Sequence, residues 1–334
     1  MMSKNNINLI AEIGGNHEGN FDYALELTEL AIKSSADCVK FQLYTGETIV
    51  NKLVEPDRHK HFLKFELTKE QHIDLAKLCI KNGKEYLASV WDKSMLDWID
   101  PFLERYKVGS GDLTNKVLLQ EFAKRGKPII LSTGLSCLEE VLEAVNFIRD
   151  KNAVYFKEGF LTVMQCTSMY PITDTDANLG VLDTFSDIKN ITLGYSDHTE
   201  HSEALYLAVI LGAKILEFHF TDSKEGKVFR DHKVSLTCDE VNVLRQKIDR
   251  AHALIGSSQK IPLQIERDSG HVESFRRALY LQKDILAGEF ISEDICVALR
   301  PNKGISAWDL DRLVGLRAKV NIGKLEPLSF SMFE

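Results

Sequence analysis

The sequence lacks several features that mark common classes of protein. No apolar run among its 334 residues approaches the roughly 18–20 positions of a membrane-spanning helix. Basic residues are fewer than acidic ones, 41 against 49, so the net charge of −8 disfavours binding to nucleic acid or to an anionic membrane. The phosphate-binding pattern Gly-x-x-x-x-Gly-Lys-Ser/Thr is also absent, which disfavours nucleotide hydrolysis.

Cysteine pairs and a secretory leader are lacking too. The six cysteines include no Cys-x-x-Cys pair, and the first residues have no apolar signal core. We therefore expect reduced thiols and a cytoplasmic location. With 44% hydrophobic and 27% charged residues, the composition is that of a globular protein, long enough for one large domain or a large and a small one.

A repeated alternation of short apolar runs and amphipathic segments fills the chain from residue 7 to about residue 256. The runs are expected strands: Ile7–Ile13, Cys38–Leu43, Glu85–Val90, Tyr106–Gly109, Pro128–Ser132, Leu161–Gln165, Ile191–Tyr195 and Lys214–Phe220. Helical spacing marks segments between them, among them Tyr23–Lys33, Lys69–Lys81, Leu138–Ile148 and Glu203–Leu211. Eight such units in about 250 residues predict an α/β fold, a closed (β/α)8 TIM barrel. An open doubly wound sheet is the alternative, but no Gly-x-Gly-x-x-Gly follows the first run.

The pattern changes after residue 256. Residues 257–270 form a mostly polar stretch that contains Gly, Ser, Gln, Asp and one Pro, so we expect a linker there. Residues 271–334 contain short apolar runs broken by turns: Ala278–Leu281, Ile295–Leu299 and Ala318–Val320. They predict a small, mostly β domain after a barrel domain of residues 1–256. A core this small is marginal alone, so we expect the domain to dock on another surface.

Polar residues gather where the expected barrel strands end. In a barrel, side chains at the carboxyl ends of the strands line the active-site mouth. These positions hold Glu12, Lys40, Gln42, Ser89, Lys107, Ser110, Ser132, Ser168, Ser196, His198, Glu217 and His219. Charges within a buried strand need partners or a ligand, so their convergence on one rim predicts a ligand site. Two lysines and several hydroxyls favour phosphate or carboxylate, and Glu217 is a further substrate-binding candidate.

Two histidines end neighbouring strands, His198 after the seventh and His219 in the eighth. Adjacent strands lie about 4.8 Å apart, so the two imidazoles could share one metal ion. A pair of packed or hydrogen-bonded histidines is the alternative. Two nitrogen ligands with carboxylates and water nearby suit Mn²⁺ or Mg²⁺ better than a closed zinc site.

Seven motifs, in order along the chain, resemble those of the sialic acid (N-acetylneuraminate) synthase family. They are Ala11–Gly19, Val39–Gln42, Lys107–Gly111, Ile130–Gly134, Gln165–Pro171, Gly194–Thr199 and Glu217–Thr221. The tail from Ser274 to Ile305 resembles the antifreeze-like (SAF) domain of that family. The resemblance implies a TIM barrel followed by an SAF domain, and an enzyme that uses phosphoenolpyruvate to form a carbon–carbon bond.

Members of this family condense phosphoenolpyruvate with an open-chain N-acylated hexosamine, giving a nine-carbon 2-keto sugar acid and phosphate. The resemblance implies that His198 and His219 bind a divalent metal ion, most simply Mn²⁺, with Mg²⁺ or Co²⁺ as alternatives. It also implies Glu12 beside the reacting carbons and Arg300 as the arginine that a partner's small domain places over the site in a domain-swapped homodimer. Phosphoenolpyruvate would meet Lys40, Lys107, Ser110, Ser132, Ser168 and Ser196, and the sugar would meet Gln42, Asp112, Tyr170 and Asp231.

Three segments depart from the family pattern. Ser89-Val90-Trp91-Asp92 stands where the family commonly has Ser-Thr-Pro-Phe, so a hydroxyl expected near phosphoenolpyruvate is absent at Val90. The segment from Tyr44 to Phe65, expected as a long loop, does not match the sugar-contacting segment, and residues 222–230 are altered. The acceptor therefore stays open between N-acetylmannosamine, for N-acetylneuraminate synthase, and a 2,4-diacetamido-deoxyhexose, for legionaminic or pseudaminic acid synthase. A non-catalytic carbohydrate-binding relative is the alternative from another class.

Overall fold

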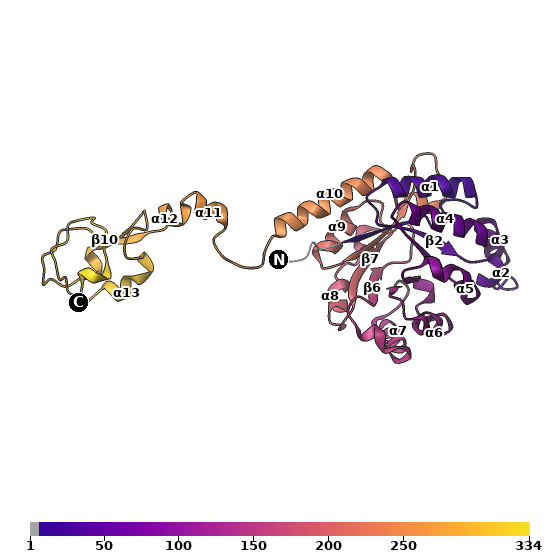
Figure 1. Ribbon diagram of the computed structural model, residues 1–334, viewed down its shortest axis with the longest axis horizontal. Coiled ribbons are helices and arrows are strands. Elements are labelled where there is room, and N and C mark those ends of the chain that lie inside the picture. The colour runs from indigo at the N-terminus through magenta and orange to yellow at the C-terminus, as the bar shows by residue number, and fades with distance from the viewer. Residues whose placement is uncertain (1–6) are drawn as a thin grey trace. The chain divides into compact units, whose positions relative to one another are not determined.

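The computed structural model describes residues 7–334, and contacts divide the chain into one unit that ends at Ile255 and a second, Gly256–Glu334. The first unit is a closed barrel of eight parallel strands (Figure 1). Its strands are β1 (Asn8–Glu12), β2 (Cys38–Leu43), β3 (Glu85–Val90), β4 (Tyr106–Val108), β5 (Ile129–Ser132), β6 (Leu161–Cys166), β7 (Thr192–Asp197) and β8 (Ile215–Phe220). Because β1 pairs with both β2 and β8, the sheet closes, and the predicted (β/α)8 barrel is confirmed. A short strand, β9 (Ser235–Leu236), pairs with β8.

Helices surround the barrel (Figure 1). They are α1 (Phe21–Lys33), α2 (Gly46–Ile49), α3 (Pro56–Phe65), α4 (Lys69–Lys81), α5 (Leu96–Ile99), α6 (Lys116–Arg125), α7 (Leu138–Lys151), α8 (Val181–Ser186), α9 (Glu203–Ile210) and α10 (Cys238–Ile255). The local sequence determines where several helices begin. Asn20 caps the N-terminus of α1, and Thr68 forms a capping box with Gln71 at the N-terminus of α4. The prediction of a long loop between Tyr44 and Phe65 is wrong, because the helices α2 and α3 lie there. Pro56 occupies the first turn of α3, a position where proline favours the start of a helix.

Two apolar cores position the site. The larger core lies between the strands and the helices. A separate cluster gathers Ile10, Cys38, Leu87, Ile130, Met164 and Ile215, one residue from each of six strands. Each of these six residues stands two positions before a residue at the carboxyl end of its strand. Residues i and i+2 of a strand point to the same face. The inward-facing residues Glu12, Lys40, Ser89, Ser132, Cys166 and Glu217 therefore form the next layer, above an apolar floor.

The second unit has its own small core around Leu281, Ile285 and Ile322. Its sheet is an antiparallel pair, β10 (Ala278–Leu281) and β11 (Cys296–Leu299). Three short helices accompany it, α11 (Gln264–Asp268), α12 (His271–Ser274) and α13 (Leu310–Leu313). The linker expected at residues 257–270 is thus partly helical, and the run expected at Ala318–Val320 makes only an isolated bridge, from Ala318 to Phe333.

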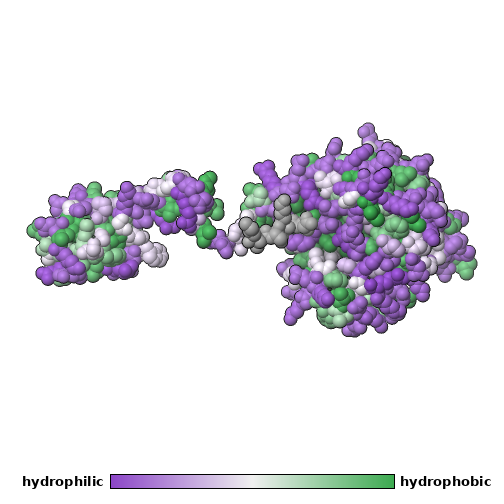
Figure 2. All heavy atoms as spheres, in the orientation of Figure 1, coloured by the Kyte–Doolittle hydropathy of each residue, from purple (hydrophilic) through white to green (hydrophobic). Residues whose placement is uncertain are grey.

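Hydrophilic side chains cover most of the face of the barrel unit seen in Figure 2, with apolar side chains scattered among them. This is the surface expected when the strands and the inner helix faces bury most of the large apolar residues. Among residues 7–334, no helix combines the length and the apolar character needed to cross a bilayer.

Candidate active site

A cavity of about 720 Å³ opens at the carboxyl ends of the barrel strands. Fifteen of the sixteen residues expected at the site from the sequence line it: Glu12, Lys40, Gln42, Ser89, Lys107, Ser110, Asp112, Ser132, Ser168, Tyr170, Ser196, His198, Glu217, His219 and Asp231. The sixteenth, Arg300, belongs to the second unit. The barrel therefore gathers, in one cavity, residues spread over most of its sequence.

Two lysines and two glutamates form a buried ionic network directly above the apolar floor. Lys40 Nζ lies 2.8 Å from Glu12 Oε2 and 3.4 Å from Glu217 Oε1. Lys107 Nζ lies 3.4 Å from the same Glu217 oxygen and donates a hydrogen bond to Ser132 Oγ at 2.7 Å. All four charged side chains are more than nine-tenths buried, so each depends on its partners for the stabilisation that water would otherwise give.

The network shifts the pKa of its members. Burial lowers the pKa of Lys107 below its usual value, and this effect dominates. Burial also acts on Lys40, but the carboxylates of Glu12 and Glu217 outweigh it and raise the pKa. Burial alone would raise the pKa of Glu217, but the two ammonium groups lower it instead, and Ser196 Oγ donates to Glu217 at 3.1 Å. The result is a balanced set of two cations and two anions, with hydroxyls beside it, where a bound anion can reach two ammonium groups.

His198 and His219 lie side by side in the same cavity, with ring centroids 5.4 Å apart. His198 Nδ1 lies 2.7 Å from the carbonyl oxygen of Thr167, which makes Nδ1 the protonated nitrogen and leaves Nε2 with its lone pair. His219 Nδ1 is buried, has no hydrogen-bond partner among the described residues, and lies 3.8 Å from Asp231 Oδ2. Burial lowers the pKa of both imidazoles, which favours the neutral form that a metal ion requires.

The chemistry of these two side chains fits a divalent cation. A neutral imidazole fixed by a carbonyl on its other nitrogen is the usual arrangement for a histidine ligand, and the orphaned His219 nitrogen is a second candidate. No group of three or more His, Cys, Asp or Glu within residues 7–334 is placed to hold a metal ion. A cation would therefore have two imidazole ligands and would complete its coordination with oxygen atoms of substrate or water. The identity of the bound ion, Mn²⁺ with Mg²⁺ or Co²⁺ as alternatives, stays a prediction.

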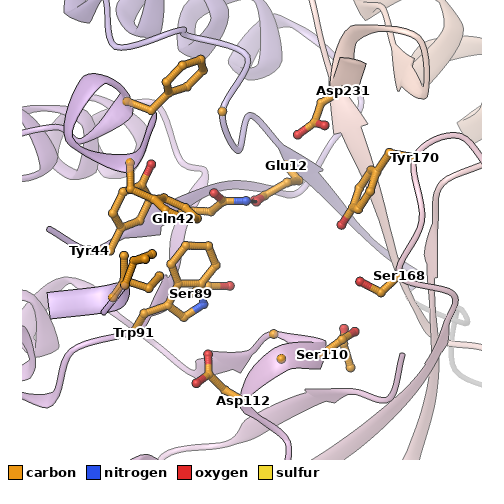
Figure 3. A pocket seen from close by; sticks show the side chains of 18 of the residues that line it. Glu12, Gln42, Tyr44, Ser89, Trp91, Ser110, Asp112, Ser168, Tyr170 and Asp231 are labelled. Carbon is orange, nitrogen blue, oxygen red and sulfur yellow. Dashed lines mark hydrogen bonds between the residues drawn. The ribbon is translucent and has the colours of Figure 1, made fainter. Parts of the chain in front are cut away.

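Further polar side chains line the same cavity (Figure 3). Gln42 Nε2 donates to Glu12 Oε1 at 3.2 Å, so the amide holds the carboxylate in place. Tyr170 packs against His198, with ring centroids 4.0 Å apart, and lies across the cavity from Gln42. Burial raises the pKa of Asp112, whose carboxylate accepts a hydrogen bond from Asn115 Nδ2 at 3.0 Å. These groups can bind hydroxyls and amides of a polar, uncharged ligand.

One expectation about the end of β3 needs correction. Val90 is buried in the core between strands and helices, so the hydroxyl that it lacks would not have faced the cavity, whereas Ser89 does line it. Five further aromatic residues of the cavity lining were not expected from the sequence: Tyr44, Phe62, Phe65, Trp91 and Phe229. A signal for two of them existed, because Tyr44 and Trp91 directly follow the ends of β2 and β3.

Arg300 lies in the second unit, directly after β11, and is exposed. Its Nε donates to the carbonyl oxygen of Phe275 at 2.8 Å, and its guanidinium lies 5.2 Å from the centroid of the Phe275 ring. The side chain is thus held in a defined position on the surface of this unit.

A closed (β/α)8 barrel with charged and polar side chains converging at the carboxyl ends of its strands is the architecture of a TIM-barrel enzyme. The chain belongs to the NeuB family, whose model matches residues 27–260, and the SAF domain model matches residues 276–334. Both the resemblance and the SAF domain expected from the sequence are therefore confirmed. As a member of this family of phosphoenolpyruvate-condensing synthases, the protein is an enzyme, a transferase.

Individual relatives cover nearly the whole chain. It is 34% identical to the N,N'-diacetyllegionaminic acid synthase of Legionella pneumophila, over 94% of this chain and 91% of that protein. It is 29% identical to the human N-acetylneuraminate-9-phosphate synthase, over 94% and 89%. The crystal structure of an N-acetylneuraminic acid synthetase from Leptospira borgpetersenii, in complex with citrate, is 27% identical and superposes with a TM-score of 0.72 over 80% of this chain and 91% of that chain.

Proposed function

We propose that the protein condenses phosphoenolpyruvate with an open-chain N-acylated hexosamine to give a nine-carbon 2-keto sugar acid and phosphate. N-acetylmannosamine is the simplest acceptor and would make the product N-acetylneuraminate. One observation carries the proposal: a cluster of two lysines and several serines opens into the same cavity as two neutral, adjacent imidazoles. Such a site can bind a phosphorylated enol and an uncharged sugar together.

Phosphoenolpyruvate would bind over the ionic network. Its phosphate and carboxylate would accept hydrogen bonds from Lys40, Lys107 and the hydroxyls of Ser132 and Ser196, all of which line the cavity. Binding two ammonium groups would also assist the departure of phosphate, because negative charge grows on the leaving oxygen.

The condensation forms one carbon–carbon bond and breaks one bond to phosphate. Carbon 3 of the enol attacks the aldehyde carbon of the sugar, whose oxygen takes up a proton to become a hydroxyl. Carbon 2 then carries positive charge that the carboxylate of Glu12 can stabilise. Water adds to carbon 2 and loses one proton, with Glu12 or Glu217 as base. The new hydroxyl then gives its remaining proton to the departing phosphate as the bond from carbon 2 to the phosphate oxygen breaks, which leaves the keto group.

A divalent cation, when bound by His198 and His219, would act as a Lewis acid on the aldehyde oxygen. The chain's own residues would orient the acceptor beside it. Gln42, Asp112, Tyr170 and Asp231 would contact the sugar, and all four line the cavity.

We further propose that the active form is a homodimer in which the SAF domain of one subunit covers the barrel of the other. Arg300 would then approach the acceptor from the partner. Support comes from its ordered, exposed position on the second unit, together with the family resemblance.

The test supplies phosphoenolpyruvate, Mn²⁺ and N-acylated hexosamines while phosphate release is followed. His219→Ala should lower kcat by about 100-fold or more. The same variant should weaken Mn²⁺ binding measured by calorimetry. Its unfolding temperature should stay nearly unchanged, because His219 Nδ1 makes no hydrogen bond to the described residues that the substitution could break. His201→Ala, at an exposed position outside the cavity, is the matched control and should behave like the wild type.

Severe unfolding of His219→Ala with unchanged Mn²⁺ affinity would instead support a pair of packed histidines. Sugar binding without any phosphate release would support the non-catalytic carbohydrate-binding alternative.

A further inference from the structure

Two segments that depart from the family pattern, residues 44–65 and residues 222–230, meet at the cavity. Phe65, at the end of α3, packs against Phe229 with ring centroids 5.1 Å apart. His61 lies against both rings, at 4.3 Å from Phe65 and 6.3 Å from Phe229. We call these three residues the aromatic bridge, and all three line the cavity. The bridge joins α3 to the segment that follows β8.

The loop after β1 holds the aromatic bridge in place. A Cβ added at Gly15 would lie 3.0 Å from Phe229 Cζ, so the ring packs directly against the backbone of this loop. A Cβ added at Gly19 would overlap the carbonyl oxygen of Lys64, so α3 approaches the same loop closely. The position of the Phe229 ring is therefore fixed by α3 on one side and by the loop after β1 on the other.

The two residues that follow the aromatic bridge in the sequence reach the surroundings of both imidazoles. The guanidinium of Arg230 lies 4.8 Å from the centroid of the Tyr170 ring, and that ring packs on His198 at 4.0 Å. Asp231 Oδ2 lies 3.8 Å from His219 Nδ1, and Tyr170 meets His219 edge-on at 5.4 Å. Asp231 and Tyr170 lie on the same side of the cavity (Figure 3). Arg230 Nε also donates to Asp231 Oδ1 at 3.2 Å, which links the two contacts.

The backbone of Asp231 has an anchor of its own. Ser235 Oγ donates to the carbonyl oxygen of Asp231 at 2.7 Å, and Asn16 Nδ2 donates to Ser235 Oγ at 2.8 Å. Asp231 is buried, Phe229 is half-buried and Arg230 is exposed. The segment thus has two fixed points, the Asp231 carbonyl group and the Phe229 ring, and Arg230 lies between them.

We propose that Phe229 is a positioning residue for the cation site. Its ring fixes the backbone of Arg230 and Asp231, and these two residues hold Tyr170 and the two imidazoles in place. A side chain that never touches the cation then sets the affinity for it, as outer partners of histidine ligands commonly do. This inference rests on the proposed function, because it concerns the cation site of the same reaction.

The test measures Mn²⁺ binding to the metal-free protein by calorimetry, without substrates. Phe229→Ala should weaken Mn²⁺ binding by about 10-fold, the lower end of the loss typical of an outer partner of a histidine ligand. Phe229→Leu keeps an apolar side chain against Phe65 and should regain most of the affinity. Val228→Ala, at the neighbouring position that is 95% exposed, is the matched control and should bind Mn²⁺ like the wild type. Phosphoenolpyruvate binding should not change in any of the three, because its proposed ligands belong to the ionic network and not to this segment.

A second variant, Gly15→Ala, displaces the Phe229 ring without altering it. The added Cβ would lie 3.0 Å from Phe229 Cζ, so the ring must move by a few tenths of an ångström. Gly15 does not have a positive φ, so its backbone accepts alanine without strain. Gly15→Ala should therefore weaken Mn²⁺ binding as well. It should have no further effect in the Phe229→Ala background, because the contact through which it acts is then gone.

An unchanged Mn²⁺ affinity in Phe229→Ala, additive losses in the double variant, or equal losses of Mn²⁺ and phosphoenolpyruvate binding would overturn the positioning role while the reaction itself stood. Where Phe229→Ala folds poorly, Gly15→Ala decides in its place, and a wild-type Mn²⁺ affinity of that variant would overturn the role. A wild type that neither binds Mn²⁺ nor releases phosphate with any acceptor would overturn the proposed function and this inference together.

Discussion

Lys40 is the residue on which the charge balance of the cavity depends. It is the one lysine of the network in contact with both glutamates, at 2.8 Å from Glu12 and 3.4 Å from Glu217. Of the two glutamates, Lys107 contacts only Glu217. Removing the Lys40 charge therefore leaves Glu12 buried without a cation, and burying an unpaired carboxylate is far more costly than losing a surface ion pair.

Lys40→Met should abolish turnover and lower the free energy of unfolding by about 3–5 kcal/mol. The double variant Lys40→Met/Glu12→Gln should regain most of that stability, because Lys107 and Glu217 still form one balanced pair. Lys60→Met, which breaks an exposed pair with Asp57 at 3.4 Å, should cost roughly 0–1 kcal/mol. Urea unfolding curves measure all three. A double variant no more stable than Lys40→Met would refute the charge-balance account.

At the scale of elements, α4 packs on the barrel through a buried histidine. His72 Nδ1 lies 2.9 Å from the hydroxyl of Tyr86 on β3, and the Tyr86 ring stacks on Phe41 of β2 at 5.7 Å. Burial lowers the pKa of His72 to about 3. The helix is thus joined to the sheet by a side chain that the fold keeps neutral.

The low pKa of His72 predicts a pH dependence of stability. In the unfolded chain the imidazole takes up a proton below about pH 6.5, whereas in the folded chain it stays neutral down to about pH 3. Its contribution is therefore complete above pH 6.5 and is lost as the pH falls, by about 1.4 kcal/mol per unit. His72→Gln keeps a polar partner for Tyr86 but does not titrate, so its unfolding free energy should fall less between pH 7 and pH 5. Parallel curves for variant and wild type would contradict this.

Helices and strands with a strong apolar periodicity could be predicted from the sequence. Helices that depend on contacts with distant residues could not. The strands β2 and β3 and the helix α4 begin and end where their apolar patterns do. The helices α2 and α3 were missed because their segment is mostly polar and exposed. The apolar side of α3 is buried only through distant partners, Phe62 against Tyr44 and Trp91 and Phe65 against Phe229.

The sequence predicts which charged residues line the cavity, but not which of them form ion pairs. Strand ends of a barrel converge by topology, so Glu12, Lys40, Lys107 and Glu217 could be placed on one rim from the sequence. Which lysine contacts which glutamate depends on strand register and side-chain geometry. Neither is encoded in local periodicity, and Lys40 therefore emerged as the central cation only from the structure.

At the scale of the whole molecule, the chain consists of two units with separate cores. The barrel core and the small core around Leu281 share no residue. The small unit presents Arg300 at its surface, fixed by the Phe275 carbonyl group and ring. A barrel that obtains its arginine from a partner would make activity a property of the pair of subunits.

Mixing two inactive variants tests this arrangement. Arg300→Ala should weaken acceptor use by about 10-fold or more, as expected when a charged contact to substrate is lost. When it is mixed with His219→Ala under conditions that exchange subunits, activity should return. In a swapped heterodimer, one barrel keeps His219 and receives Arg300 from the other chain. An arginine acting within its own chain would give no recovery.

The pairing of β1 with β8 has a consequence for how the protein is made. Translation delivers the first strand early, and its second neighbour only after most of the barrel has left the ribosome. Until then, the nascent sheet has an open edge that is prone to mispairing and aggregation. Nonsense or frameshift products that stop before residue 215 would therefore have no closed sheet and would be substrates for chaperones and proteases.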